Sequence, residues 1–166
     1  MMNRSFAEAL GVLPSARDEA GQKLANKVYL GTSWIPAPGA ASALNRLIDK
    51  GFGSAVVSNT VHGELAPLLR ATKICDVGGN LASVAAIIDS RVIGFEKPDR
   101  RPFLAALEAL GVDASECVHV GDSLHSDVAG AINVGMRPIH IDPLTLCDDL
   151  THEHFSTFEQ FVNQLA

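Results

Sequence analysis

Apolar and polar positions along this chain form two kinds of segment. Short apolar runs are typical of strands buried in a parallel sheet, and stretches with apolar residues three and four positions apart are typical of amphipathic helices. The strand-like runs are 54–57, 84–88, 117–120 and 137–141, and the helix-like stretches are 40–49, 62–70, 102–110, 126–133 and 157–165. Because strands and helices alternate, the sequence predicts an α/β fold: a three-layer, Rossmann-like parallel sheet with helices on both faces.

The first 33 residues follow a different pattern. Apolar residues at helical spacing stop at Pro14, which breaks the run. A second helix is predicted from Ser15, a favourable capping residue, to about Tyr29. We therefore expect two parts, a helical segment over 1–33 and an α/β unit over 34–166.

Composition narrows the classes of function. The chain has 166 residues and a net charge of −6, which disfavours nucleic acid as a partner because phosphate contacts need clustered Lys and Arg. No apolar run approaches the roughly 20 residues that span a bilayer, so no membrane partner is expected. Three cysteines at spacings that match no metal motif are typical of a reduced cytoplasmic protein.

Two carboxylates follow the strand at 117–120. Gly121 ends that strand, and Asp122 and Asp127 come directly afterwards. Ligands bind at the carboxyl ends of parallel strands, and paired carboxylates suit a hard cation such as Mg²⁺. The sequence therefore predicts a metal site at Asp122 and Asp127, with a turn and a helix cap as the alternative roles.

Three hydrogen-bonding residues follow the strand at 54–57. Ser58 and Asn59 can donate to phosphoryl oxygens, and Thr60 is grouped with them as a phosphate contact. Lys97 precedes Pro98, which holds it extended and away from a helix, where it can neutralise a phosphate or a carboxylate. The alternatives are a plain turn at 58–60 and a solvated surface lysine.

Two histidines near the C-terminus give a weaker signal. His152 and His154 are separated by one residue, and we expect them in a surface loop rather than at a metal.

The order of these motifs resembles the haloacid dehalogenase superfamily of hydrolases. Ser-Asn after a strand, then Lys97-Pro98-Asp99, then Gly121-Asp122 and Asp127 occur here in the family's order, within a similarity that covers Trp34 to about Asp142. The similarity is to the phosphatase-like branch with a helical cap, and 1–33 resembles the end of such a cap.

The resemblance implies a role for each motif. In that family an Asp-x-Asp-x-Thr or Val motif supplies the nucleophile, which forms an aspartyl-phosphate, and the acid/base. By the same resemblance Ser58 would hold the phosphoryl oxygens, Lys97 would balance charge, and Asp122 would bind Mg²⁺. Asp127 would support the metal or orient Lys97. The implied activity is a Mg²⁺-dependent phosphatase acting on a small phosphorylated metabolite.

The family's first motif is missing from this sequence. Only Asp18 and Asp49 precede Ser58, and neither belongs to an Asp-x-Asp pair. Without a nucleophile, covalent catalysis has no attacking group, so we expect this chain to be inactive. The missing strand is central in the family, between the strands that end at Val57 and Val120. Its absence would leave unpaired edges that favour self-association.

The sequence alone leaves three interpretations of this chain open. The chain is a truncated phosphatase-type hydrolase, as its start inside a cap-like segment suggests, or a non-catalytic remnant that binds a ligand or partner. The third reading is an unrelated flavodoxin-like binding domain.

Overall fold

The structure is a computed structural model that describes residues 13–17, 19, 35–61 and 63–165. The chain divides into two compact units, 1–35 and 36–166. In the first unit the described residues include a short 3-10 turn, η1 (Pro14–Ala16). Most of the two helices predicted over 1–29 lies outside the described residues.

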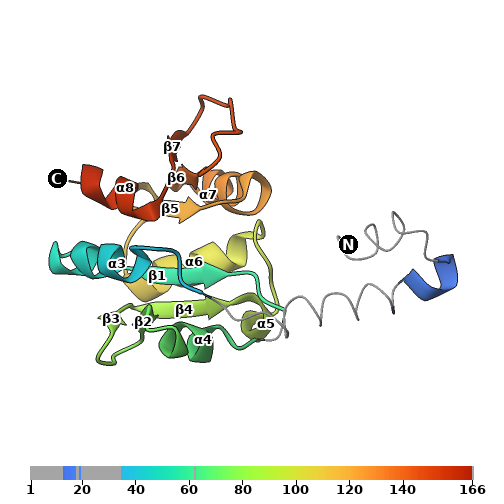
Figure 1. The fold of residues 1–166 in the computed structure, drawn as a ribbon, viewed down its shortest axis with the longest axis horizontal. Coiled ribbons are helices and arrows are strands. Elements are labelled where there is room, and N and C mark those ends of the chain that lie inside the picture. Colours follow the sequence, from blue (N-terminus) through green and yellow to red (C-terminus); the bar gives the residue numbers. More distant parts are fainter. Residues whose placement is uncertain (1–12, 18, 20–34, 62, 166) are drawn as a thin grey trace. The chain divides into compact units, whose positions relative to one another are not determined.

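The second unit is built on parallel strands (Figure 1). Strand β1 (Ala55–Ser58) pairs in parallel with β4 (Ala86–Asp89). A second sheet has the order β5 (Val118–Gly121), β6 (Arg137–Ile141) and β7 (Glu153–Phe155), again parallel. The short strands β2 (Cys75–Asp76) and β3 (Ala82–Ser83) form a separate pair.

Helices connect these strands. The predicted helices at 40–49, 62–70, 102–110, 126–133 and 157–165 correspond to α3 (Ala40–Asp49), α4 (Leu65–Ala71), α6 (Arg100–Leu110), a π-helical turn η3 (Leu124–Val128) that leads into α7 (Ala129–Val134), and α8 (Phe158–Gln164). Two short elements complete the unit, α5 (Ser90–Ile93) and the 3-10 turn η2 (Ala114–Glu116). Among the described residues, no helix is long and apolar enough to cross a bilayer.

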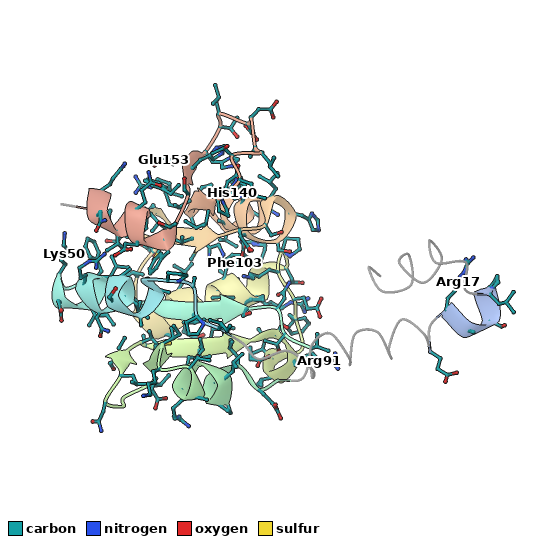
Figure 2. The ribbon with its side chains drawn as sticks, viewed as in Figure 1. Arg17, Lys50, Arg91, Phe103, His140 and Glu153 are labelled. Atoms are coloured by element: carbon teal, nitrogen blue, oxygen red, sulfur yellow. The ribbon has the colours of Figure 1, made fainter. Side chains whose placement is uncertain are left out.

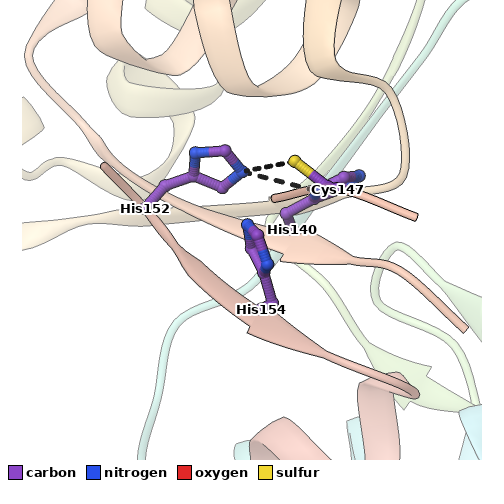
Figure 3. A group of neighbouring side chains, drawn as sticks. All are labelled: His140, Cys147, His152 and His154. Atoms are coloured by element: carbon purple, nitrogen blue, oxygen red, sulfur yellow. Dashed lines mark hydrogen bonds between the residues drawn. The ribbon is translucent and has the colours of Figure 1, made fainter. Parts of the chain in front are cut away.

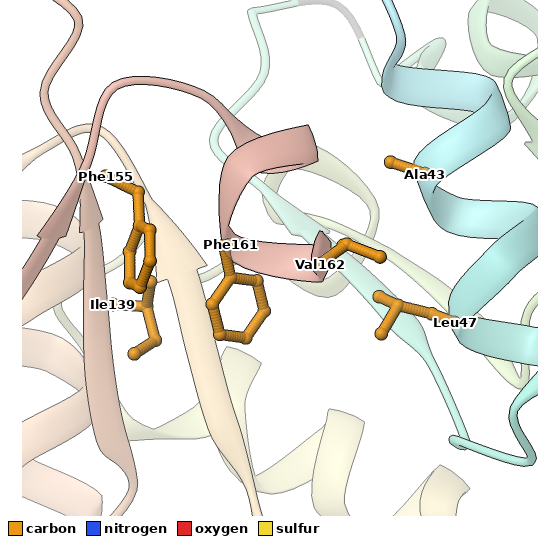
Figure 4. Packing of buried hydrophobic residues seen from close by; sticks show 6 residues of the cluster. All are labelled: Ala43, Leu47, Ile139, Phe155, Phe161 and Val162. Atoms are coloured by element: carbon orange, nitrogen blue, oxygen red, sulfur yellow. The ribbon is translucent and has the colours of Figure 1, made fainter. Parts of the chain in front are cut away.

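Two of the three apolar clusters of the core flank the β5–β6–β7 sheet. On one side, helices α3 and α8 pack against β6 and β7, as Figure 4 shows through Ala43, Leu47, Ile139, Phe155, Phe161 and Val162. On the other side, α6 and α7 meet through a cluster centred on Phe103, which is fully buried within the unit (Figure 2). The predicted three-layer α/β fold with helices on both faces is confirmed.

The sheet is interrupted between β1 and β5. In the described part of the chain the two sheets share no hydrogen-bonded strand pair, so β1 and β5 each have one edge without a strand partner. The absence of a central strand stays a prediction, because residues 1–12 and 20–34 lie outside the described part of the chain. Helix α3 bridges the two sheets, since Leu44 and Ile48 pack near Val56 of β1 while Ala43 and Leu47 pack near Ile139 of β6.

Some element boundaries differ from the sequence prediction. Helix α6 begins at Arg100 rather than 102, because the Asp99 side chain caps it by accepting a hydrogen bond from the backbone N–H of Arg101. The strand predicted at 84–88 begins at Ala86 and ends at Asp89. Strand β7 was not predicted, because only three residues carry it and they show no long apolar run.

Candidate functional site

Lys97 is held at the interruption between the two sheets. Its ammonium group donates to the backbone carbonyl of Val57, at the end of β1, over 2.9 Å. The same Nζ lies 2.6 Å from Oδ1 of Asp127, in the turn that follows β5. A single side chain therefore connects the carboxyl ends of the strands that flank the interruption.

Asp127 is the buried anionic centre of this site. Its side chain is 6% exposed and also accepts hydrogen bonds from Nε2 of His119 at 2.9 Å and from the backbone N–H of Ser123 at 3.0 Å. Burial by itself would raise the pKa of this carboxyl, but the hydrogen bonds from His119 and Lys97 outweigh it and hold the pKa well below its usual range. Asp127 is therefore ionised and paired with Lys97 near neutral pH.

Asn59 fixes the backbone of Lys97. Its amide Nδ2 donates to the carbonyl of Lys97 at 2.9 Å, and its Oδ1 accepts the N–H of Lys97 at 2.8 Å. This reciprocal pair ties the loop after β1 to the loop that carries the lysine. In this structure the Asn59 side chain positions Lys97, whereas the sequence predicted it as a phosphate contact.

Thr60 is anchored to the end of β4. Its hydroxyl donates to Asp89 in a short hydrogen bond, and its backbone N–H donates to Oγ of Ser90 at 2.9 Å. The buried Asp89 carboxylate also accepts the N–H groups of Leu65 and Arg91. Burial would raise the pKa of Asp89, but these hydrogen bonds, led by that of Thr60, lower it. The Thr60 side chain, also predicted as a phosphate contact, therefore stabilises the loop after β1 through its hydrogen bond to Asp89.

Ser58 and Asp122 keep free side-chain groups. Ser58 ends β1 opposite Asp89 of β4, and its hydroxyl has no hydrogen-bond partner among the described residues. Asp122 is exposed directly after β5, and within the described ranges its carboxylate is likewise unpaired. These two groups remain available to a ligand.

The resemblance implies a bound divalent cation, and the carboxylates of Asp122 and Asp127 differ in how well they could bind it. The free carboxylate of Asp122 is a hard oxygen ligand that fits Mg²⁺. The geometry of Asp127 suits the orienting role, because Oδ1 already accepts Lys97 and His119 while Oδ2 accepts one backbone N–H. Asp122 would therefore be the main protein ligand of the cation, and a contribution from Asp127 stays a prediction.

Gly121 permits the close approach of Asp127. A β-carbon built at this position would lie 2.2 Å from Cγ of Asp127, far inside van der Waals contact. Gly130, the second residue of α7, permits a similar close approach, because a β-carbon there would lie 2.4 Å from Cζ of Phe103. Gly121 is thus required by the position of Asp127, and Gly130 by the packing of α7 onto Phe103 of α6.

Two residues of this site, the half-buried His119 and the buried Asp89, were not predicted from the sequence. His119 lies on β5 and packs edge-on against Phe103, with ring centroids 4.9 Å apart, while it reaches Asp127. Asp89 holds the loop that carries Thr60. A signal for each was available in the sequence. His119 is a polar residue within the apolar run at 117–120, and Asp89 directly follows the apolar run at 84–88.

The prediction for the C-terminal histidines was wrong. His154 lies in strand β7, and the side chain of His152 is completely buried rather than exposed in a surface loop. Sequence spacing could not place them beside His140, which lies twelve positions before His152 on the neighbouring strand.

Comparison with known proteins assigns the chain to one group of hydrolases. A family model described as haloacid dehalogenase-like hydrolase matches residues 3–135. The match overturns the flavodoxin-like alternative.

Curated relatives and solved structures agree with that match. A phosphoserine phosphatase from Thermus thermophilus is 33% identical over 141 residues, which cover 84% of this chain and 53% of that protein. A ribulose-1,5-bisphosphate 5-phosphatase from Halopiger xanaduensis is 36% identical over 107 residues, covering 64% of this chain and 42% of that protein. The crystal structure of a HAD phosphatase from Thermococcus onnurineus superimposes with a TM-score of 0.69 at 20% identity, covering 99% of this chain and 86% of that one. The chain spans about half or less of the length of the curated relatives it matches.

Proposed function

Because this chain belongs to the haloacid dehalogenase-like hydrolases, we propose that its site is the phosphate-binding and charge-neutralising part of a phosphatase that acts on a small phosphorylated metabolite. The observation that carries the proposal is the position of Lys97, fixed between Val57 and Asp127 at the ends of two strands. Similarity to phosphatases of phosphoserine and of a sugar bisphosphate supports the substrate class.

Each residue of the site has a defined part in this proposal. Phosphoryl transfer depends mainly on positioning and on neutralisation of phosphoryl charge. The ammonium of Lys97 supplies a fixed positive charge, oriented by Asp127 and by Asn59. The hydroxyl of Ser58 is free to donate to a phosphoryl oxygen. Mg²⁺, when bound at Asp122, would neutralise further phosphoryl charge.

We infer that the chain by itself does not turn over a phosphate ester. No Asp-x-Asp pair occurs anywhere in its sequence, so neither the nucleophile nor the acid/base of the family is supplied. The same absence favours a second candidate function, a non-catalytic domain that binds a phosphorylated ligand or a partner. The two functions differ in whether a supplied first motif restores turnover.

We expect weak binding of inorganic phosphate and of Mg²⁺. Amide shifts of the labelled chain during a phosphate titration should centre on Ser58 and Lys97, and Ser58→Ala should weaken phosphate binding about 2- to 10-fold, the effect of one lost hydrogen bond. A Mg²⁺ titration should move Asp122, with an affinity on the order of millimolar because one carboxylate supplies most of the ligand charge.

Matched variants separate this site from general surface binding. Asp122→Asn should abolish the response to Mg²⁺, whereas Asp49→Asn, which removes an exposed carboxylate at the end of α3, should leave it unchanged. Equal loss in both variants, or phosphate shifts that bypass Ser58 and Lys97, would contradict the proposed function.

A further inference from the structure

Four side chains away from the Lys97 site converge beside the β5–β6–β7 sheet. They are His140 on β6, Cys147 in the segment that follows, and His152 and His154 at β7 (Figure 3). Each offers one ligand atom, and these atoms all lie within 4.8 Å of one another. Three imidazoles and one thiol are borderline or soft ligands, which favour Zn²⁺ over Mg²⁺.

Two separations, both measured from His152, are close to those of a tetrahedral metal site, within a set of ligand atoms that all lie within 4.8 Å of one another. Nε2 of His152 lies 3.4 Å from Nδ1 of His140 and 3.9 Å from Sγ of Cys147. With Zn–N distances of about 2.0–2.1 Å and a Zn–S distance of about 2.3 Å, tetrahedral ligand atoms are roughly 3.3–3.6 Å apart. Contractions of a few tenths of an ångström would bring His152 to bonding distance of a shared ion.

Hydrogen bonding leaves this cluster unsatisfied. Nε2 of His154 is buried without a hydrogen-bond partner. Nε2 of His152 faces two neighbours, His140 and Cys147, but one ring N–H cannot donate to both at once. Buried polar atoms in native proteins are normally paired, so a bound cation explains what hydrogen bonds do not.

The surroundings supply the second shell that metal-binding histidines require. Metal-ligating histidines usually direct their other ring nitrogen to a carbonyl or a carboxylate. Nε2 of His140 lies 3.3 Å from the backbone carbonyl of Asp122, and Nδ1 of His152 lies 3.8 Å from Oδ2 of Asp149. Asp142 accepts the backbone N–H of Cys147 at 2.8 Å and so fixes the segment that carries the thiol.

We propose that His140, Cys147, His152 and His154 bind one Zn²⁺ ion in a closed, structural site. Four protein ligands leave no open position for substrate, as in structural zinc sites. The ion would fasten the 142–152 segment to strands β6 and β7, and binding would displace the proton of the Cys147 thiol. Through His140 it would also steady the backbone of Asp122.

Cobalt substitution tests the ligand set directly. The metal-free full-length chain should bind one equivalent of Co²⁺, with the intense visible bands of tetrahedral coordination and a near-ultraviolet thiolate-to-cobalt band, and Zn²⁺ should displace it. Cys147→Ser should remove the thiolate band, while Cys117→Ser, a matched thiol in another cluster, should retain it. A cation held by Asp122 has oxygen ligands and gives no thiolate band.

Further variants should change the affinity for Zn²⁺ by amounts that depend on the role of each residue. Asp149→Asn should lower the affinity for Zn²⁺ roughly 10- to 100-fold, the usual effect of losing a second-shell partner. His154→Asn should lower it further, and His125→Asn, which changes an exposed histidine, should have no effect. The proposal is overturned if the wild-type chain binds no Co²⁺, or if its cobalt spectrum lacks the thiolate band or keeps it in Cys147→Ser. The wild-type spectrum decides even if a variant fails to fold.

Discussion

Lys97→Met is expected to lower the free energy of unfolding by about 3 kcal/mol, at the low end of the range for breaking a buried ion pair. The variant leaves the ionised carboxylate of Asp127 buried, with His119 and the Ser123 N–H as its remaining partners. It also removes the donor to Val57 at the end of β1. Urea unfolding of both proteins at neutral pH measures the difference.

Two controls make this result specific to the buried pair. Arg137→Met removes an exposed ion pair with Glu153, whose atoms are 3.7 Å apart, and should cost about 1 kcal/mol or less. In the double variant Lys97→Met/Asp127→Asn, the total loss should be smaller than the sum of the two single losses, because each single variant leaves an uncompensated charge. Additive losses would show that the two residues are not coupled.

The same pair gives the stability a defined pH dependence. The folded pKa of Asp127 lies below its unfolded value of about 3.9. Its contribution is therefore fully present above that unfolded value and is lost as pH falls through the folded pKa. The stability difference between wild type and Lys97→Met should consequently be constant near neutral pH and should shrink below about pH 4.

Gly121→Ala should destabilise the chain by about 1–3 kcal/mol, the range for overpacking a filled interior. The added methyl group would lie 2.2 Å from Cγ of Asp127, so the carboxylate must move away from Lys97 and His119. Gly53→Ala is the matched control, because its β-carbon would meet only the flexible end of Leu110, at 3.2 Å.

Thermal unfolding and NMR together identify the cause. The Gly121→Ala variant should melt at a lower temperature than the Gly53→Ala variant and should show amide shifts at Lys97, across the interruption in the sheet. A variant with wild-type stability, or one whose shifts stay confined to 118–123, would mean that the Asp127 position tolerates the methyl group without loss of the ion pair.

The sequence predicted the longer strands and helices of the 36–166 unit because each is marked by a local pattern, whereas the short elements β2, β3, α5 and β7 were not predicted. The apolar run at 117–120 and the periodicity at 40–49 needed no tertiary information. Lys97 and Asp127 were predicted as site residues from the order of motifs, and in the structure Nζ of Lys97 lies 2.6 Å from Oδ1 of Asp127.

Residues whose roles depend on tertiary packing could not be predicted in the same way. His119 reaches Asp127 from inside a strand, and Asn59 acts on Lys97 across thirty-eight positions of sequence. The histidine and cysteine cluster depends on the parallel pairing of β6 with the three-residue strand β7. None of these contacts follows from spacing along the chain.

The central claim is that the chain carries the phosphate-binding part of a hydrolase site but no nucleophile. A synthetic peptide of apolar residues followed by Asp-x-Asp-x-Thr should pair by strand addition with the edges of β1 and β5 that have no strand partner among the described residues. A second peptide, with its first aspartate replaced by asparagine, is the matched control.

The deciding measurement is hydrolysis of p-nitrophenyl phosphate with Mg²⁺, recorded together with the melting temperature. We predict negligible turnover by the chain alone, a higher melting temperature with either peptide, and turnover only with the peptide that carries both aspartates. Stabilisation without turnover would favour the non-catalytic binding domain. Turnover by the chain alone that Asp122→Asn abolishes would contradict the account.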